Sequence, residues 1–239
     1  MDAAQIAALL EPFLEQPLSP SQLDQISTYI DLLQRWNARI NLTAIRNPEE
    51  IVTRHFGESF FLARHLFPDS SKFCHPERSE GSASCLASKL PQDFLPAQPS
   101  PPRVLDIGSG AGFPALPLKL WAPYIDLTLI ESNHKKAAFL REVARALTLT
   151  NINVIAGRAE ALAARPRFPQ AEVVTLRAVE RFETILPQAV TFLAPKGTLA
   201  LLIGAAQIPH LSTLTNLKWN PPINIPESQR RVLSIGVRE

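Results

Sequence analysis

The sequence Val104-Leu105-Asp106-Ile107-Gly108-Ser109-Gly110-Ala111-Gly112-Phe113-Pro114 decides the fold of this 239-residue chain. A short run typical of a buried strand leads into three glycines at alternate positions, and an apolar run continues beyond Pro114. Because glycine has no Cβ, the backbone there can turn with positive φ and pass close to a ligand. A helix expected over 114–121 would present its N-terminus to that ligand. The stretch therefore predicts the first turn of a nucleotide-binding α/β sheet.

Downstream of this turn, apolar runs typical of strands alternate with helical patterns. The strands are expected at 103–107, 126–131, 152–156, 172–176, 198–203 and 230–237. The helices between them are expected at 114–121, 134–147, 159–164 and 182–193. Such alternation predicts an α/β fold of Rossmann-like type, with a mostly parallel sheet and helices on both faces.

Upstream, residues 3–66 have a helical pattern, strongest where Leu23, Ile26, Ile30 and Leu33 form one apolar stripe. Ser21 and Asp24 are expected to cap this helix, and a second helix is expected over 48–66. Ser, Pro and Lys dominate the segment that follows, which is long for a loop inside a compact domain. We therefore divide the chain into a helical extension (1–67), a flexible insertion (68–102) and a ligand-binding domain (103–239).

Composition narrows the function classes. An apolar content of 46% is enough for a sizeable core, no apolar run approaches the length of a membrane span, and no secretory signal is recognisable at the N-terminus. Cys74 and Cys85 predict neither a disulfide framework nor a metal site. The net charge of +2 is too small to indicate nucleic-acid binding by itself. A cytoplasmic protein without metal or membrane partner is expected, with a monomer favoured.

The glycine spacing distinguishes between two classes of cofactor that carry a nucleoside. A dinucleotide fingerprint has glycine at its first, third and sixth positions, but Phe113 occupies the sixth position counted from Gly108. Gly108, Gly110 and Gly112 after Asp106 instead resemble the first motif of S-adenosylmethionine (SAM) methyltransferases. An NAD-dependent dehydrogenase remains the minor alternative.

Two further positions fit a bound nucleoside. Glu131 ends the second strand, where a carboxylate accepts hydrogen bonds from ribose hydroxyls in either cofactor class. Ala159 and Glu160 follow the third strand, where such folds contact adenine. Each glutamate also has a simpler explanation: a solvated strand end for Glu131, and an acid favoured at a helix N-terminus for Glu160.

Six blocks in order carry a family resemblance: Leu33 to Ile45, Arg54 to Ser59, the glycine motif, Glu131-Ser132 with Lys135-Lys136, Gly157 to Glu160, and Leu176 to Val179. This series resembles the bacterial small-subunit ribosomal RNA guanine-N7 methyltransferases, the glucose-inhibited division protein B family. The resemblance implies a class I SAM-dependent methyltransferase fold with a helical N-terminal part. It also implies SAM contacts at Gly108, Phe113, Ala159, Glu160 and Arg177.

The sequence departs from the family pattern at several positions. Glu58 stands where the family usually has Asp, Leu176 where Ser is common, and Ile203-Gly204 where Lys-Gly is usual. The region after Gly204 looks shortened, and the segment 68–102 is an addition. These departures bear on RNA docking more than on SAM binding.

Guanine N7 carries a lone pair and no proton, so no general base is expected and catalysis can rest on orientation. Arg177, at the carboxyl end of the fourth strand, is expected to position the cofactor or an RNA phosphate; the alternative is an arginine paired with Glu180 or Glu183. His55 and Glu58 either tie their helix to the sheet as a buried polar pair or line the acceptor pocket.

Four basic residues are the candidate RNA contacts: Arg35, Arg39, Lys135 and Lys136. Their simpler interpretation is a solvated face. The leading hypothesis is SAM-dependent methylation of guanine N7 in 16S ribosomal RNA, as naked RNA or in the small subunit. The alternatives are a SAM methyltransferase with another acceptor, and a non-catalytic SAM- or RNA-binding module.

Overall fold

The computed structural model describes residues 1–68, 100–178 and 182–239. Almost all of the predicted insertion 68–102, with both cysteines, lies outside the described residues. Its flexibility therefore stays a prediction.

Within the described residues the chain forms one eight-stranded sheet in the order β3-β2-β1-β4-β5-β8-β6, with β7 paired to β8. The first five strands pair in parallel, while β8 runs antiparallel to β5, β6 and β7. The strands are β1 (Arg103–Ile107), β2 (Asp126–Glu131), β3 (Ile152–Ala156), β4 (Ala171–Arg177), β5 (Leu193–Gly204), β6 (Leu217–Trp219), β7 (Ile223–Asn224) and β8 (Arg231–Arg238).

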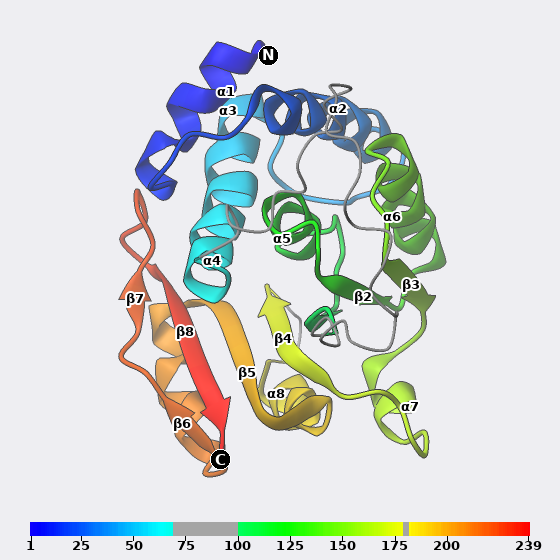
Figure 1. Cartoon of the computed structure of the whole chain (residues 1–239), viewed down its shortest axis with the longest axis vertical. Coiled ribbons are helices and arrows are strands. Elements are labelled where there is room, and N and C mark those ends of the chain that lie inside the picture. Colours follow the sequence, from blue (N-terminus) through cyan, green and yellow to red (C-terminus); the bar gives the residue numbers. More distant parts are fainter. Residues whose placement is uncertain (69–99, 179–181) are drawn as a thin grey trace, which may run out of the picture.

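Helices cover both faces of this sheet (Figure 1). One core packs α1, α2, α4, α5 and α6 against the sheet, and the other packs α7 and α8 against the opposite face. The predicted α/β class with a helical N-terminal part is confirmed. The helices are α1 (Ala3–Leu10), α2 (Pro20–Asn37), α3 (Pro48–Glu50), α4 (Glu58–Leu66), α5 (Ala115–Trp121), α6 (His134–Ala146), α7 (Ala159–Ala163) and α8 (Phe182–Thr191).

The N-terminus of α2 differs from the prediction. The N-cap is Ser19, whose hydroxyl accepts a hydrogen bond from the Gln22 backbone, and Gln22 returns a bond to the Ser19 backbone. Pro20 occupies the first helical position, where its missing N–H costs nothing. The predicted capping pair of Ser21 and Asp24 was therefore wrong by two residues.

The predicted helix over 48–66 is present but not regular. Between α3 and α4 the backbone passes through a π-helical stretch, Ile51–Gly57. Gly57 allows this stretch to pack tightly, because a Cβ there would lie only 2.6 Å from the Phe13 ring. The wider turns rotate the side chains of Arg54 and His55 relative to an ideal α-helix, and π-helical turns of this kind are frequent at functional sites.

The carboxyl ends of β1 to β4 meet at one edge of the sheet. The chain goes from β1 outward to β2 and β3, then returns to place β4 on the other side of β1. Ligands in open α/β sheets bind at such a switch point, outside the carboxyl ends of the strands.

Candidate functional site

A cavity of about 760 Å³ opens at this switch point. Its volume falls within the range of small-molecule sites, roughly 300–1,000 Å³. Strand ends, the glycine loop and the N-terminal extension all contribute to its wall. Among the lining residues are Thr43, Ala44, Ile45, Arg54, His55, Gly108, Gly110, Phe113, Glu131, Asn133, Lys136, Gly157, Arg158, Ala159, Glu160 and Arg177.

The three glycines of the loop after β1 have different environments. All have positive φ: 70° at Gly108, 53° at Gly110 and 88° at Gly112. A Cβ on Gly110 would find no atom nearer than 3.7 Å, and this residue lines the cavity. A Cβ on Gly112 would lie 2.4 Å from the Tyr29 hydroxyl, and Gly112 does not line the cavity. Gly110 therefore leaves room for a ligand, whereas Gly112 lets the loop pack on α2.

Asp106 lies behind the cavity wall, although the sequence placed it in the candidate cofactor set. Its side chain is 1% exposed, and its Oδ1 accepts a 2.6 Å hydrogen bond from the Thr175 hydroxyl. Its Oδ2 is buried without a partner. Burial raises the pKa of the Asp106 carboxyl to about 7, against the lowering effect of the hydrogen bond from Thr175. Direct contact between Asp106 and a ligand in the cavity would require the wall to move.

Glu131 closes the glycine loop from the end of β2. Its Oε2 accepts a hydrogen bond from the Gly110 backbone at 2.8 Å, and its Oε1 accepts one from the Asn133 backbone at 2.7 Å. The carboxylate therefore has a fixed orientation and still borders the cavity. An ionised carboxylate has about four lone-pair sites, so Glu131 keeps acceptor capacity for a ligand hydroxyl.

The wall continues at the start of α7. Ala159 is buried and Glu160 is exposed, and both border the cavity. A Cβ on Gly157, just before them, would have no neighbour within 4 Å. This side of the cavity therefore offers an open backbone and one carboxylate.

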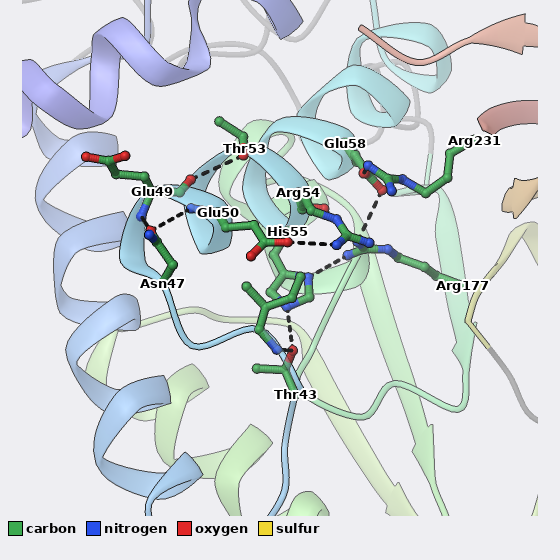
Figure 2. Close-up of polar contacts among 11 residues, drawn as sticks. Thr43, Asn47, Glu49, Glu50, Thr53, Arg54, His55, Glu58, Arg177 and Arg231 are labelled. Carbon is green, nitrogen blue, oxygen red and sulfur yellow. Dashed lines mark hydrogen bonds and ion pairs between the residues drawn. The ribbon is translucent and has the colours of Figure 1, made fainter. Parts of the chain in front are cut away.

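Arg177 forms the part of the wall that adjoins the extension, at the end of β4 (Figure 2). Its Nη1 donates to His55 Nδ1 at 3.1 Å, and its Nη2 donates to Glu58 Oε2 at 3.1 Å and to the Arg54 carbonyl at 2.6 Å. The alternative partner Glu183 was wrong, because Glu183 pairs with His210. Glu180 lies outside the described residues.

His55 is held neutral in the cavity wall. Because Arg177 can only donate, His55 Nδ1 is the acceptor, which leaves the ring proton on Nε2 facing the Thr43 hydroxyl at 2.8 Å. Burial, followed by the positive charges of Arg177, Arg54 and Arg231, lowers the pKa of His55 to about 2. The Phe113 ring stacks on the His55 ring at 4.6 Å and on the Tyr29 ring at 5.2 Å. With both ring nitrogens engaged, His55 is poorly suited to act as a base.

The structure thus separates the two interpretations of the His55 and Glu58 pair. His55 borders the cavity, whereas Glu58 is 1% exposed and lies behind Arg177. Both belong to one polar network that joins the extension to the sheet.

The candidate RNA contacts do not gather in the cavity. Lys136 lines it, while Lys135 is exposed on the first turn of α6 and does not. Arg35 and Arg39 are exposed at and just beyond the last turn of α2, also outside the cavity lining.

Several lining residues were not singled out from the sequence. Thr43, Arg54 and Arg158 lie inside three of the resembling blocks, so the blocks carried a signal for them. Asn133 lies two residues beyond the end of β2. Proximity to the carboxyl end of a parallel strand was the signal available for Asn133.

Within residues 1–68, 100–178 and 182–239, no helix has the length and apolar character needed to cross a membrane. The same described ranges hold no cluster of three or more His, Cys, Asp or Glu side chains that could bind a metal ion.

Comparison with solved structures finds partial likenesses to methyltransferases. One is the ribosomal protein L11 methylase from Lactobacillus delbrueckii subsp. bulgaricus, with a TM-score of 0.49 and 15% identity over 60% of this chain and 73% of that one. Another is the precorrin-6y C5,15-methyltransferase from Geobacter metallireducens GS-15, with a TM-score of 0.47 and 16% identity over 59% of this chain and 82% of that one.

Sequence comparison gives a stronger likeness. The family described as "GidB: rRNA small subunit methyltransferase G" matches residues 22–75 and 92–217, which is more than half of the chain. The Ribosomal RNA small subunit methyltransferase G of Roseiflexus castenholzii is 36% identical over 76% of this chain and 68% of its own length. The protein of the same name from Streptococcus pyogenes serotype M5 is 34% identical over 83% of this chain and 72% of its own length. The match runs through both the extension and the sheet that build the cavity, and the chain belongs to the rRNA small subunit methyltransferase G family.

Proposed function

We propose that the protein transfers a methyl group from SAM to N7 of a guanine in 16S ribosomal RNA. One observation carries the proposal: in a chain of this family, the cavity at the switch point joins an open glycine loop to a wall whose histidine, His55, has both ring nitrogens engaged. Methylation of a ring nitrogen with a free lone pair needs orientation rather than proton removal.

The residues of the cavity fit SAM. Open space beside Gly110 leaves room for a ligand against the loop backbone, and Glu131 can accept hydrogen bonds from ribose hydroxyls. Ala159 and Glu160 would flank the adenine, and Arg177 would attract the carboxylate of the methionyl part. SAM supplies an electrophilic methyl group on a sulfonium. The residues of this chain bind and orient both reactants.

The charge of the wall suits the product as well as the substrate. Guanine gains a positive charge when N7 is methylated, so a protonated histidine at the acceptor would oppose the reaction. His55 avoids this because its pKa is lowered to about 2 and its ring stays neutral. Glu131 and Glu160 place negative charge on the same cavity wall.

For the RNA, we propose phosphate contacts by Lys136 at the cavity and by the exposed Lys135, Arg35 and Arg39 outside its lining. Binding through such contacts weakens steeply as salt concentration rises. The site of action would be the cytoplasm, where ribosomal RNA is available.

The test is a transfer assay with methyl-labelled SAM and three acceptors: naked 16S rRNA, small ribosomal subunits and tRNA. Label is expected in one of the two ribosomal acceptors, with 7-methylguanosine in the digest. Label only in tRNA would indicate another acceptor. Tight SAM binding without transfer to any of the three would identify a binding module, and a tight NAD complex without SAM binding would establish a dehydrogenase.

A further inference from the structure

Behind the cavity wall, a buried carboxylate lies between two arginines from distant parts of the chain (Figure 2). Glu58, on the first turn of α4, is 1% exposed. Its Oε2 accepts the hydrogen bond from Arg177 at 3.1 Å, and its Oε1 lies 2.5 Å from Nη2 of Arg231 on β8. The carboxylate therefore links α4, β4 and β8 at one point.

These contacts fix how Arg177 faces the cavity. A guanidinium has five N–H groups in one rigid plane. Arg177 uses both Nη2 protons on Glu58 and the Arg54 carbonyl, and one Nη1 proton on His55. Its Nε proton and one Nη1 proton remain for a ligand. Of the three groups that accept these bonds, the Arg54 carbonyl and the His55 ring are neutral and the Glu58 carboxylate is negative, so Glu58 contributes the strongest attraction.

The charges of the network make Glu58 hard to replace. Arg54 is matched by Glu50 through an ion pair at 2.8 Å, and His55 is neutral. Among the described residues, the ion pairs of Arg177 and Arg231 both go to Glu58, and Asp106 acts on Arg177 more weakly than Glu58 does. Removing the negative charge would leave two neighbouring guanidinium groups that repel each other, and Arg177 is the one held in place at the cavity.

A second cavity lies on the other side of this network. It has a volume of about 310 Å³ and is lined in part by Arg54, Glu58 and Arg231, but not by Arg177. Arg231 therefore has open space beside it, and a change at that position can be accommodated without filling the site at the switch point.

We propose that Glu58 is a positioning residue that acts through Arg177, and that Arg231 holds Glu58 in the orientation this requires. The inference rests on the proposed function only in naming SAM as the ligand that Arg177 meets. Glu58 itself does not touch the ligand. Its effect on binding must therefore vanish when Arg177 is removed.

The first test measures Arg177 directly and needs no ligand. In the full chain, arginine side-chain NMR should show a guanidinium with hindered rotation, assigned to Arg177 because it is missing from Arg177→Gln. Glu58→Gln keeps the shape and removes the charge, and it should average this signal. An unchanged Arg177 signal in Glu58→Gln would overturn the proposal.

The second test is a double-mutant cycle on SAM affinity, measured by calorimetry. Glu58→Gln is expected to weaken SAM binding roughly tenfold, about 1.4 kcal/mol. In the Arg177→Gln background the same change should have no further effect, within about twofold. Equal losses in both backgrounds would show a general structural role and refute the positioning one.

A matched control lies on the same strand as Arg177. Glu172, near the other end of β4, also pairs with an arginine, Arg103, at 2.8 Å, but does not line the site at the switch point. Glu172→Gln should leave the Arg177 signal and SAM affinity unchanged. If Glu58→Gln does not fold, Arg231→Gln undergoes the same two measurements. An undisturbed Arg177 signal with unchanged SAM affinity in Arg231→Gln would count against the proposal.

The outcomes separate this inference from the proposed function. Loss of the fixed Arg177 signal in Glu58→Gln, together with no SAM binding or methyl transfer by the unaltered chain, would support the positioning role and reject the function. Active transfer with an undisturbed Arg177 signal would do the reverse.

Discussion

The second and third glycines of the loop give opposite predictions when each is replaced by alanine. Gly110 and Gly112 both have positive φ, 53° and 88°. Only Gly110 borders the cavity, and only Gly112 has a crowded Cβ position. Gly112→Ala should therefore destabilise the fold, whereas Gly110→Ala should mainly disturb ligand binding.

The magnitudes follow from the geometry. At Gly112, an alanine in a left-handed conformation costs about 1–2 kcal/mol, and overpacking adds about 1–3 kcal/mol, because the new Cβ would lie 2.4 Å from the Tyr29 hydroxyl and 2.6 Å from Leu116 Cδ1. A total of about 3 kcal/mol corresponds to a fall in Tm of roughly 6–12 °C for a chain of this size. At Gly110 only the conformational cost of about 1–2 kcal/mol applies, or roughly 2–8 °C.

Thermal unfolding and SAM calorimetry on both variants provide the assay. Gly110→Ala should retain most of its stability and bind SAM at least about tenfold more weakly, because its methyl group projects into the cavity. Gly112→Ala should show the larger fall in Tm. Equal losses of Tm in the two variants, or unimpaired SAM binding by Gly110→Ala, would refute the division of roles between these glycines.

Two further predictions concern the groups beneath the loop. Burial raises the pKa of Asp106 to about 7 from an ordinary 3.8, so between these values the folded state holds a proton that the unfolded state has lost, and stability falls as pH rises. The wild type should lose about 2–3 kcal/mol of unfolding free energy from this carboxyl between pH 5 and pH 8, and Asp106→Asn should lose less over the same interval in denaturant titrations. Asp126→Asn, at an exposed carboxylate, should follow the wild type, and an equal pH slope in Asp106→Asn would contradict the assignment. Tyr29→Phe removes the hydroxyl that donates to the buried Ala111 carbonyl at 2.5 Å, so it should lower the unfolding free energy by about 1–3 kcal/mol, and an unchanged Tm would show that this bond contributes little.

The strands of the parallel part were predictable because buried parallel strands appear as short apolar runs bounded by turn residues. Each of the five predicted runs from 103–107 to 198–203 coincides with or overlaps one of the strands β1 to β5, and the run 230–237 overlaps β8. The small strands β6 and β7 were missed. They have three and two residues, and pairing with β8 rather than local pattern defines them.

The sequence around the start of α2 contains a local signal for the correct N-cap. Proline favours the first helical position, so Pro20 pointed to Ser19 as the N-cap and to Gln22 as its partner. The spacing of Ser21 and Asp24 matches a capping box and favours Ser21 instead. In the structure the fixed φ of proline and the Ser19 cap decide where the helix begins.

Within the site, the alternation of side-chain directions along a strand explains why Asp106 does not line the cavity. Asp106 pairs in register with Thr175 on β4, and both side chains point to the same face of the sheet as Val104 and Val173. That face is covered by α2, α4 and α5, so Asp106 is buried beneath the loop instead of lining the cavity. The motif predicts an acid at this position, but its direction follows from the period of two along the strand.

The partner of Arg177 could not be found from the sequence, because Glu58 lies 119 residues away and in a different part of the predicted organisation. Spacing rules for charged pairs apply within one helix or between adjacent strands. The local candidates were therefore Glu180 and Glu183. Only the packing of α4 beside β4 and β5 brings the Glu58 carboxylate to the end of β4.

The N-terminal extension contributes to the site in three separate ways. Thr43, Arg54 and His55 line the cavity, Tyr29 supports the loop from below, and Glu58 holds Arg177. Its apolar residues belong to the same core as those of α5, α6 and one face of the sheet. The boundary after residue 67 therefore marks a change in sequence pattern. Residues on both sides of it contribute to the core and to the cavity wall. If the extension were only an RNA-binding arm, its removal would leave a folded SAM-binding sheet; because it forms part of the core and the cavity wall, its removal should abolish both.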